Sequence, residues 1–268
     1  MKPSTFFGRH PVFRFDEFRA AYLAKGTRSA QTAASILKQH VAAGRLINVR
    51  RGLYACLPPG ADPTSFRVDP YLLASRVSKN SILAYHSALE LLGKAHSLSN
   101  RITYLTKRRV KPFEFQGIQF LAVLVPAALR NSSDSGGGLI DERRLGLALS
   151  VTGYERTMVD VLHSPRYGGG WEEIWRSLEA IEFVDLDFVV DYVLRLGSAL
   201  TVARVGFFLE QHRDELLVED RHLKTLQANV PSRPSYFDRR HRKGGKLLSR
   251  WNLIIPNKVL TRAWAEVS

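Results

Sequence analysis

Apolar and polar positions form their clearest pattern between residues 27 and 57, TRSAQTAASILKQHVAAGRLINVRRGLYACL. Within residues 29–43, apolar side chains recur at steps of three and four, which places them on one side of a helix. Ser29 is a suitable N-cap for this helix, and Gly44 can end it in a left-handed conformation. Two short apolar runs follow, joined by Arg50-Arg51-Gly52. The spacing predicts a helix followed by a two-stranded hairpin with two cations at its tip.

The face of the predicted helix opposite its apolar side chains is polar. At about 100° per residue, this face carries Arg28, Gln31, Ser35, Lys38 and Gln39, with Thr32 at its edge. A helix fits the width of the major groove of DNA, where Gln, Ser and Thr side chains can hydrogen-bond to base edges. Cations on a hairpin tip displace counterions from the DNA backbone or the minor groove. The pattern therefore predicts a winged helix-turn-helix that binds double-stranded DNA. The alternative is a small domain whose polar face contacts only solvent.

The residues expected to contact DNA fall into two groups. We expect Gln31, Thr32 and Ser35 to contact base edges. Ser29, at the start of the same helix, belongs to the expected DNA-binding residues as well. We expect four nearby cations to contact mainly phosphates or the minor groove: Arg28, Lys38, Arg50 and Arg51. One copy of such a domain reads a half-site, so two copies are expected on a repeated operator.

The segments on either side of this stretch indicate how the chain divides. Before it, aromatic residues surround a short predicted helix at residues 16–24, which Asp16 can cap and Gly26 can end. After it, Pro58-Pro59-Gly60 and Pro63 are typical of a linker. We therefore predict an α+β protein with a winged helix-turn-helix domain at residues 1–60 and a larger mixed α/β domain at residues 69–268.

The second domain is expected to contain both helices and strands. Asp69-Pro70 predicts a capped helix through Val77. Strands are expected at residues 101–106, 113–115, 118–125, 147–151 and 251–255. Further helices are expected within residues 81–92, from the capping box at residues 152–155, from 171, and at 188–196, 202–211 and 221–228. Residues 131–138, NSSDSGGG, are typical of a loop.

One cluster in this domain, Glu155, Arg156 and Asp160, has two interpretations. Two carboxylates and an arginine can form the acid-base or metal site of a nuclease or phosphotransferase. The same residues also fit a capping box from Thr152 to Glu155 and an ion pair along one helix, and we favour this structural interpretation. The eight histidines show no metal-ligand spacing, and a single cysteine, Cys56, allows no internal disulfide. We therefore expect no enzymatic activity, no cofactor and no metal.

Charge points to a polyanionic partner but is unevenly distributed. The 268 residues include 39 Lys plus Arg and 25 Asp plus Glu, a formal charge of +14. Residues 1–68 carry a net +8, whereas residues 172–220 carry a net −8. Residues 233–246 form a second basic stretch around Tyr236, which fits either a phosphate contact or a solvated loop. No apolar run approaches the roughly 20 residues of a membrane span, so we expect a cytoplasmic protein without a membrane partner.

Six motifs in order carry a resemblance to a known family. They are GRLINVRRGLYACLP near the N-terminus, AYHSALELLG at residues 84–93, VTGYERTMVDVL at 151–162, GGGWEEIWRSL at 168–178, VGFFLE at 205–210 and WNLIIP at 251–256. Together they span nearly the whole chain. The sequence resembles the AbiEi-type antitoxins of bacterial type IV toxin-antitoxin and abortive-infection systems.

The resemblance implies a function for each predicted domain. In that family an N-terminal winged helix represses the operon by binding inverted repeats in its own promoter. A larger C-terminal domain counteracts a nucleotidyltransferase-like toxin, usually without a stable complex. Two other functions stay open: a stand-alone regulator whose second domain senses a ligand, and a protein-binding module whose acidic residues 172–220 contact a basic partner.

Overall fold

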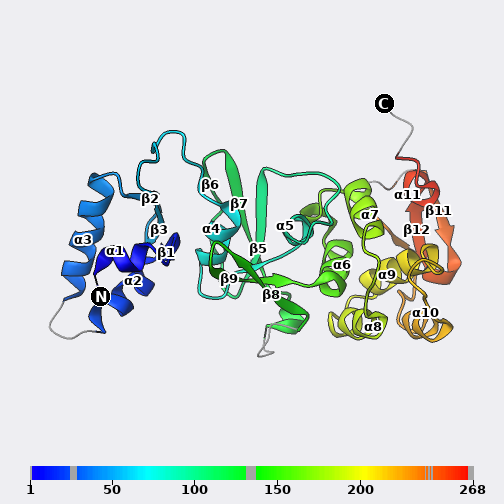
Figure 1. Cartoon of the computed structure of the whole chain (residues 1–268). Coiled ribbons are helices and arrows are strands. Elements are labelled where there is room, and N and C mark those ends of the chain that lie inside the picture. Colours follow the sequence, from blue (N-terminus) through cyan, green and yellow to red (C-terminus); the bar gives the residue numbers. More distant parts are fainter. Residues whose placement is uncertain are drawn as a thin grey trace. The chain divides into compact units, whose positions relative to one another are not determined.

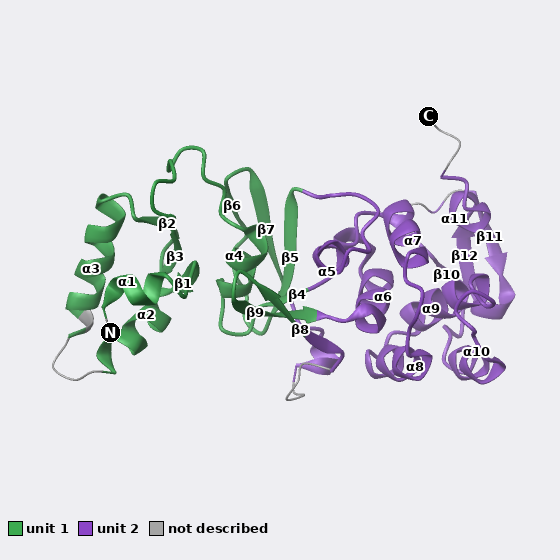
Figure 2. Cartoon of the chain, in the orientation of Figure 1, with its two compact units in different colours: residues 1–83, 100–123, 141–151 green, residues 84–99, 124–140, 152–268 purple. Residues whose placement is uncertain are grey.

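The computed structural model describes residues 2–24, 29–130, 137–238, 240, 242 and 244–264 (Figure 1). It shows a mixed α+β fold, as predicted. The chain forms two compact units: unit 1 contains residues 1–83, 100–123 and 141–151, and unit 2 contains residues 84–99, 124–140 and 152–268 (Figure 2). These units and the predicted domains, 1–60 and 69–268, divide the chain at different places.

The N-terminal part of unit 1 alternates helices and strands. Its elements are α1 (Pro3–Phe7), β1 (Val12–Arg14), α2 (Phe15–Leu23), α3 (Ala30–Ala42), β2 (Leu46–Arg50) and β3 (Leu53–Cys56). The strands form an antiparallel sheet in the order β1-β3-β2. Phe6, Phe13, Phe18 and Tyr22 pack with Leu37 of α3 in one apolar core, so the helices are held over the sheet by aromatic side chains.

The start of this part differs from the sequence prediction. α1 and β1 were not predicted, and α2 begins at Phe15 instead of Asp16. The Glu17 carboxylate accepts a hydrogen bond from the backbone N–H of Arg14 (2.7 Å), which satisfies a donor at the helix start. Asp16 instead pairs with the Arg14 side chain (3.0 Å). Gly26, the predicted end of this helix, lies outside the described residues.

The rest of unit 1 is built on a six-stranded sheet, which also includes a few residues of unit 2. Its strands are β4 (Ile82–Leu83), β5 (Arg101–Thr106), β6 (Phe113–Phe115), β7 (Ile118–Leu124), β8 (Leu139–Arg144) and β9 (Leu147–Thr152), in the order β6-β7-β5-β4-β9-β8. α4 (Pro70–Arg76) precedes them, and the Asp69 carboxylate caps it as predicted, accepting from the N–H groups of Tyr71 and Leu72. β8 was not predicted because it is an edge strand of mostly charged residues.

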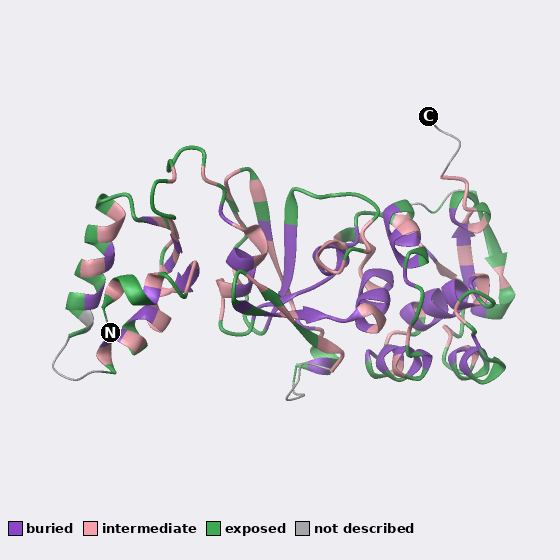
Figure 3. Cartoon of the chain, viewed as in Figure 1, coloured by how far each residue is buried: buried purple, intermediate pink, exposed green. Residues whose placement is uncertain are grey.

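Unit 2 is mainly helical. Its helices are α5 (His86–Leu91), α6 (Tyr154–His163), α7 (Trp171–Glu179), α8 (Leu186–Arg195), α9 (Ala199–Gln211), α10 (Asp220–Gln227) and α11 (Asn257–Thr261). A small sheet has the order β10-β12-β11, formed by β10 (Ser235–Tyr236), β12 (Leu253–Pro256) and β11 (Gly245–Leu248). Short 3-10 helices occupy Ala127–Leu129, Pro165–Tyr167 and Ser249–Trp251. α9 is buried over residues 201–209, as its apolar composition requires (Figure 3).

The length and apolar character of the helices show whether any of them could cross a membrane. Among the residues that the structure describes, no helix combines the length and apolar character needed to cross a bilayer.

Candidate nucleic-acid interface

α3 is anchored at both ends by the residues that the sequence indicated. The Ser29 hydroxyl accepts a hydrogen bond from the backbone N–H of Thr32 (3.1 Å), which confirms Ser29 as the N-cap. Gly44 has a φ of 65°, the left-handed conformation expected after the last turn. Ala33 and Leu37 are buried in the aromatic core, so the orientation of the helix about its axis is set by packing.

The side chains predicted to read DNA lie on the outer side of α3. Gln31, Thr32, Ser35 and Lys38 are all exposed. The Thr32 hydroxyl is hydrogen-bonded to that of Ser29 (2.9 Å), so these two residues form one local group at the helix start. Gln31, Ser35 and Lys38 project from successive turns on one face of the helix. Arg28, which was also predicted for this helix face, lies outside the described residues.

The predicted wing is a short antiparallel hairpin. β2 extends to Arg50, and an irregularity between Asn48 and Arg50 shifts its register against β3. The turn is formed by Arg51 and Gly52, and Gly52 has a φ of 79°, which a side chain would disfavour. The Gly52 carbonyl accepts from the backbone N–H of Phe15 (2.8 Å), so the turn is tied to the start of α2.

The two cations of the wing have different environments. Arg51 is exposed, as a phosphate contact requires. Arg50 is half-buried, and its guanidinium lies 4.6 Å from the centre of the Phe113 ring on β6. Both residues line a hollow of about 480 Å³, to which Arg14, Arg109 and Lys111 also contribute. Sequence reasoning missed these last three residues because their separations along the chain carry no local signal.

The cluster of Glu155, Arg156 and Asp160 is not an open site. Arg156 and Asp160 are fully buried and pair along α6 (3.4 Å), as the structural interpretation predicted. Tyr192 donates to Asp160 (2.9 Å), whereas Glu155 accepts from the backbone N–H of Asp185 (3.2 Å). Burial raises the pKa of Asp160, against the opposing effect of Arg156.

The capping box predicted for the same helix is wrong. Gly153 occupies the N-cap position of α6, and no side chain caps this helix. The Thr152 hydroxyl bonds instead to the hydroxyl of Thr157 (2.7 Å), because both are buried and each satisfies the other.

A second buried polar network lies around Glu173 of α7 and was not predicted. Its carboxylate accepts hydrogen bonds from the hydroxyls of Ser97 (2.7 Å) and Ser177 (3.0 Å) and lies 3.0 Å from His86 Nε2. These contacts hold the loop that follows α5 against α7. Among the described residues, no group of three His, Cys, Asp or Glu side chains is arranged to hold a metal ion.

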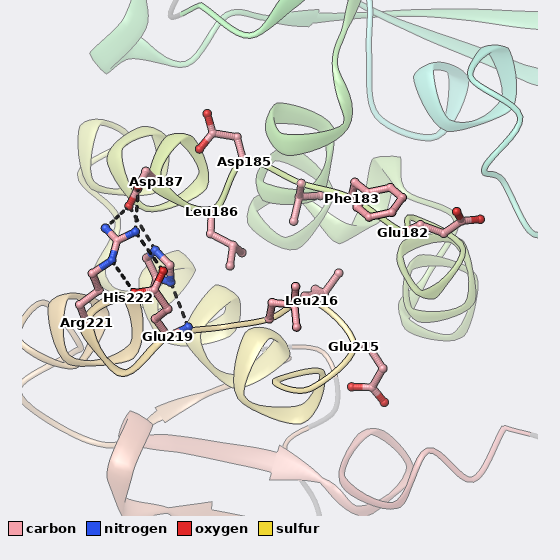
Figure 4. A pocket seen from close by; sticks show the side chains of 12 residues that line it. Glu182, Phe183, Asp185, Leu186, Asp187, Glu215, Leu216, Glu219, Arg221 and His222 are labelled. Carbon is pink, nitrogen blue, oxygen red and sulfur yellow. Dashed lines mark hydrogen bonds and ion pairs between the residues drawn. The ribbon is translucent and has the colours of Figure 1, made fainter.

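The acidic segment at residues 172–220 contributes to a groove in unit 2. Figure 4 shows this groove, of about 340 Å³, with carboxylates from Glu182, Asp185, Asp187, Glu215 and Glu219 around it. Hydrogen bonds from Arg221 hold the pKa of Asp187 below its ordinary value. Phe183 and Leu217 also line the groove and are exposed, at 83% and 78%. This surface is where the protein-binding alternative would place a basic partner.

The basic stretch at residues 233–246 is described only in part. Arg239, His241 and Lys243 lie outside the described residues. The Arg242 guanidinium lies 5.6 Å from the centre of the Tyr236 ring. Both interpretations of this stretch, as a phosphate contact and as a solvated loop, therefore stay predictions.

Comparison with known proteins identifies a solved structure with a similar fold. Neither protein families nor curated proteins give a match to this sequence. The crystal structure of the RV2827C protein from Mycobacterium tuberculosis is similar, with a TM-score of 0.57 and 18% sequence identity over 96% of this chain and 92% of that chain. At this level of identity, the similarity shows a shared fold alone.

Proposed function

We propose that this protein is a bacterial antitoxin and transcriptional autorepressor. A winged helix-turn-helix in its N-terminal part binds inverted repeats of its own promoter, with two copies on the operator. Its C-terminal part counteracts a nucleotidyltransferase-type toxin without a stable complex. The protein is cytoplasmic and acts without enzymatic turnover.

The observation that carries the DNA-binding half is the exposed polar face of α3. The element order α1-β1-α2-α3-β2-β3, with β1 paired to β3, supports the proposal of a winged helix-turn-helix. In that arrangement the second helix of the pair enters the major groove. Here this helix is α3, whose exposed side chains include Gln31, Ser35 and Lys38.

The antitoxin half rests on the ordered series of motifs that resembles the AbiEi-type antitoxins. Several of these motifs fall on buried elements of unit 2. VTGYERTMVDVL contains the buried α6, and VGFFLE lies in the buried part of α9. These motifs thus describe the scaffold of the C-terminal part.

The first test is binding of the purified chain to a duplex of its own upstream DNA and to a scrambled duplex of equal length, across a salt series. We expect a preference of about a thousandfold or more for the upstream duplex. Equal and steeply salt-sensitive binding to both would contradict the proposal, because it reports only attraction to the phosphate backbone.

Two variants separate base reading from phosphate binding. Gln31→Ala should lower the preference for the upstream duplex, by about 1–3 kcal/mol if the amide makes a bidentate contact. Arg51→Ala should weaken binding to both duplexes alike and make the salt dependence shallower. Gln119→Ala, an exposed glutamine on β7, is the matched control. A uniform loss of affinity in Gln31→Ala would remove Gln31 as a base-reading residue.

The antitoxin half is tested separately by co-expression with the nucleotidyltransferase-like product of the adjacent gene. The full chain should restore growth, and the Gln31→Ala variant should restore it equally, because neutralisation does not depend on operator reading. Growth arrest in the presence of well-expressed full chain would contradict this half of the proposal and leave the DNA-binding half standing.

A further inference from the structure

The hollow beside the wing gathers cations from three separate parts of unit 1. Arg14 comes from the end of β1, Arg50 and Arg51 from the wing, and Arg109 and Lys111 from the connection between β5 and β6. Asp16 is the single acidic residue among the side chains that line it. Five cations around one hollow repel each other, so their arrangement favours an anion between them.

The one carboxylate in the hollow is already paired. Asp16 lies 3.0 Å from Arg14 Nε and 3.4 Å from Lys79 Nζ. Burial acts to raise the pKa of Asp16, but the charges and hydrogen bonds of Arg14 and Lys79 outweigh it and hold this pKa below its ordinary value. Arg14 also pairs with Glu17 (3.1 Å). Arg14 and Asp16 thus largely neutralise each other, which leaves the charges of Arg50, Arg51, Arg109 and Lys111.

The environment of Arg50 is a second, independent observation that bears on anion binding in the hollow. Its Nη1 atom is buried and has no hydrogen-bond partner among the described residues. Its guanidinium is held in place by Phe113, which in turn stacks on Phe120 with ring centres 4.6 Å apart. Arg50 as a whole is half-buried and lines the hollow, so packing fixes its positive charge at the edge of the hollow. No ion pair of Arg51, Arg109 or Lys111 is found within the described part of the chain.

We propose that this hollow binds a phosphate group. A phosphate offers several acceptor oxygens, which suit the planar donor set of Arg50 and Arg109 together with the point charge of Lys111. The phosphate belongs either to the backbone of a bound duplex or to a small phosphate compound, and two experimental arms distinguish these sources. The first arm rests on the proposed DNA binding, whereas the second does not depend on it.

In the first arm, the affinity for the upstream duplex is measured against salt for Arg109→Ala and Lys111→Ala. Each variant should lower the slope of log K against log salt by about 0.9 if that cation neutralises one backbone phosphate. The matched controls are Lys107→Ala and Arg108→Ala, exposed cations of the same connection that do not line the hollow. These controls should keep the slope of the wild-type chain.

In the second arm, binding of inorganic pyrophosphate to the DNA-free chain is measured by calorimetry at constant ionic strength. Binding that is weakened about tenfold or more in Lys111→Ala and Arg109→Ala, but not in the two controls, identifies a small phosphate compound as the ligand. Arg50→Lys keeps the charge but removes the planar donor set, so it should weaken binding in whichever arm is positive.

Failure of the phosphate site and failure of the proposed function lead to different results. A chain that fails to bind DNA overturns the proposed function but leaves the hollow to the second arm. The phosphate site itself is overturned if neither arm separates the two hollow variants from their controls. Thermal unfolding of each variant, compared with the wild-type chain, shows whether a loss of binding comes from a loss of fold.

Discussion

At the scale of single residues, Gly206 and Trp251 show how two distant motifs meet. Gly206 lies in the buried part of α9, and Trp251 ends a 3-10 helix and is fully buried. A Cβ atom placed on Gly206 would lie 2.1 Å from Trp251 Cζ3. The motifs VGFFLE and WNLIIP therefore contain the two sides of one close contact, which neither motif reveals on its own.

We expect Gly206→Ala to destabilise the protein. The added methyl group meets a buried, rigid indole ring, so overpacking should lower the free energy of unfolding by about 1–3 kcal/mol or more. Urea unfolding followed by circular dichroism measures the change. Gly8→Ala is the control, because its Cβ would make an ordinary contact of 3.5 Å with the Ser4 carbonyl. Equal destabilisation by both changes would contradict the role assigned to the Trp251 contact.

At the scale of elements, α7 holds the loop after α5 mainly through the carboxylate of Glu173, and the Ser177 hydroxyl also accepts from the backbone N–H of His96 (2.9 Å). Glu173 accepts from the backbone N–H groups of His96 (3.0 Å) and Ser97 (3.1 Å), as well as from the Ser97 hydroxyl. Burial alone would raise the pKa of Glu173. The hydrogen bonds to its carboxylate, of which those from Ser97 have the largest effect, outweigh burial and hold this pKa below the ordinary value of 4.5. The ionised carboxylate is thus the form that the fold stabilises.

Stability should therefore depend on the charge of Glu173. Because its pKa is lower in the folded than in the unfolded chain, the stabilisation is fully present above about pH 4.5 and is lost as the pH falls through the folded-state value. Urea unfolding between pH 6 and pH 3 should show a weaker pH dependence for Glu173→Gln than for the wild-type chain. Ser97→Ala, which removes one of the hydrogen bonds, should fall between them. Parallel pH profiles for all three would refute this account.

At the scale of the whole molecule, the distribution of charge along the sequence differs from the division of the chain into two units. The basic residues 1–68 lie in unit 1, whereas the acidic residues 172–220 lie in unit 2 together with the basic stretch at residues 233–246. Each unit is nevertheless assembled from three segments of the chain. A partner that binds one unit should therefore change local stability within that unit instead of along the linear sequence.

Hydrogen exchange with and without the upstream duplex tests this expectation. A ligand that binds only the folded state stabilises it by about 2.7 kcal/mol at a hundred times its dissociation constant. We expect slower exchange in α3 and the β2–β3 hairpin, and unchanged exchange in α8 and α10. A scrambled duplex at the same concentration is the control. Protection centred on α8 and α10 would place the DNA contact in unit 2 and contradict the proposed interface.

The elements that could be predicted are those whose signals are local. The cap and stop of α3 and the Asp69 cap of α4 are confirmed, as are the strands at residues 101–106 and 113–115. In each case the signal is a side chain near its own backbone or a short periodic run of residues. β8 escaped prediction because its charged side chains show no apolar period, and its pairing with β9 supplies the missing order.

Sequence by itself determined the local units of the candidate interface: the capped α3 helix, its exposed polar face and a basic hairpin. Tertiary structure decided which distant groups meet. It placed Arg50 against Phe113, brought Arg109 and Lys111 to the wing and surrounded Glu173 with donors from another segment. Local structure depends on hydrogen bonds and periodicity within a few residues, whereas these meetings depend on how buried apolar faces pack. Spacing along the chain does not encode that packing residue by residue.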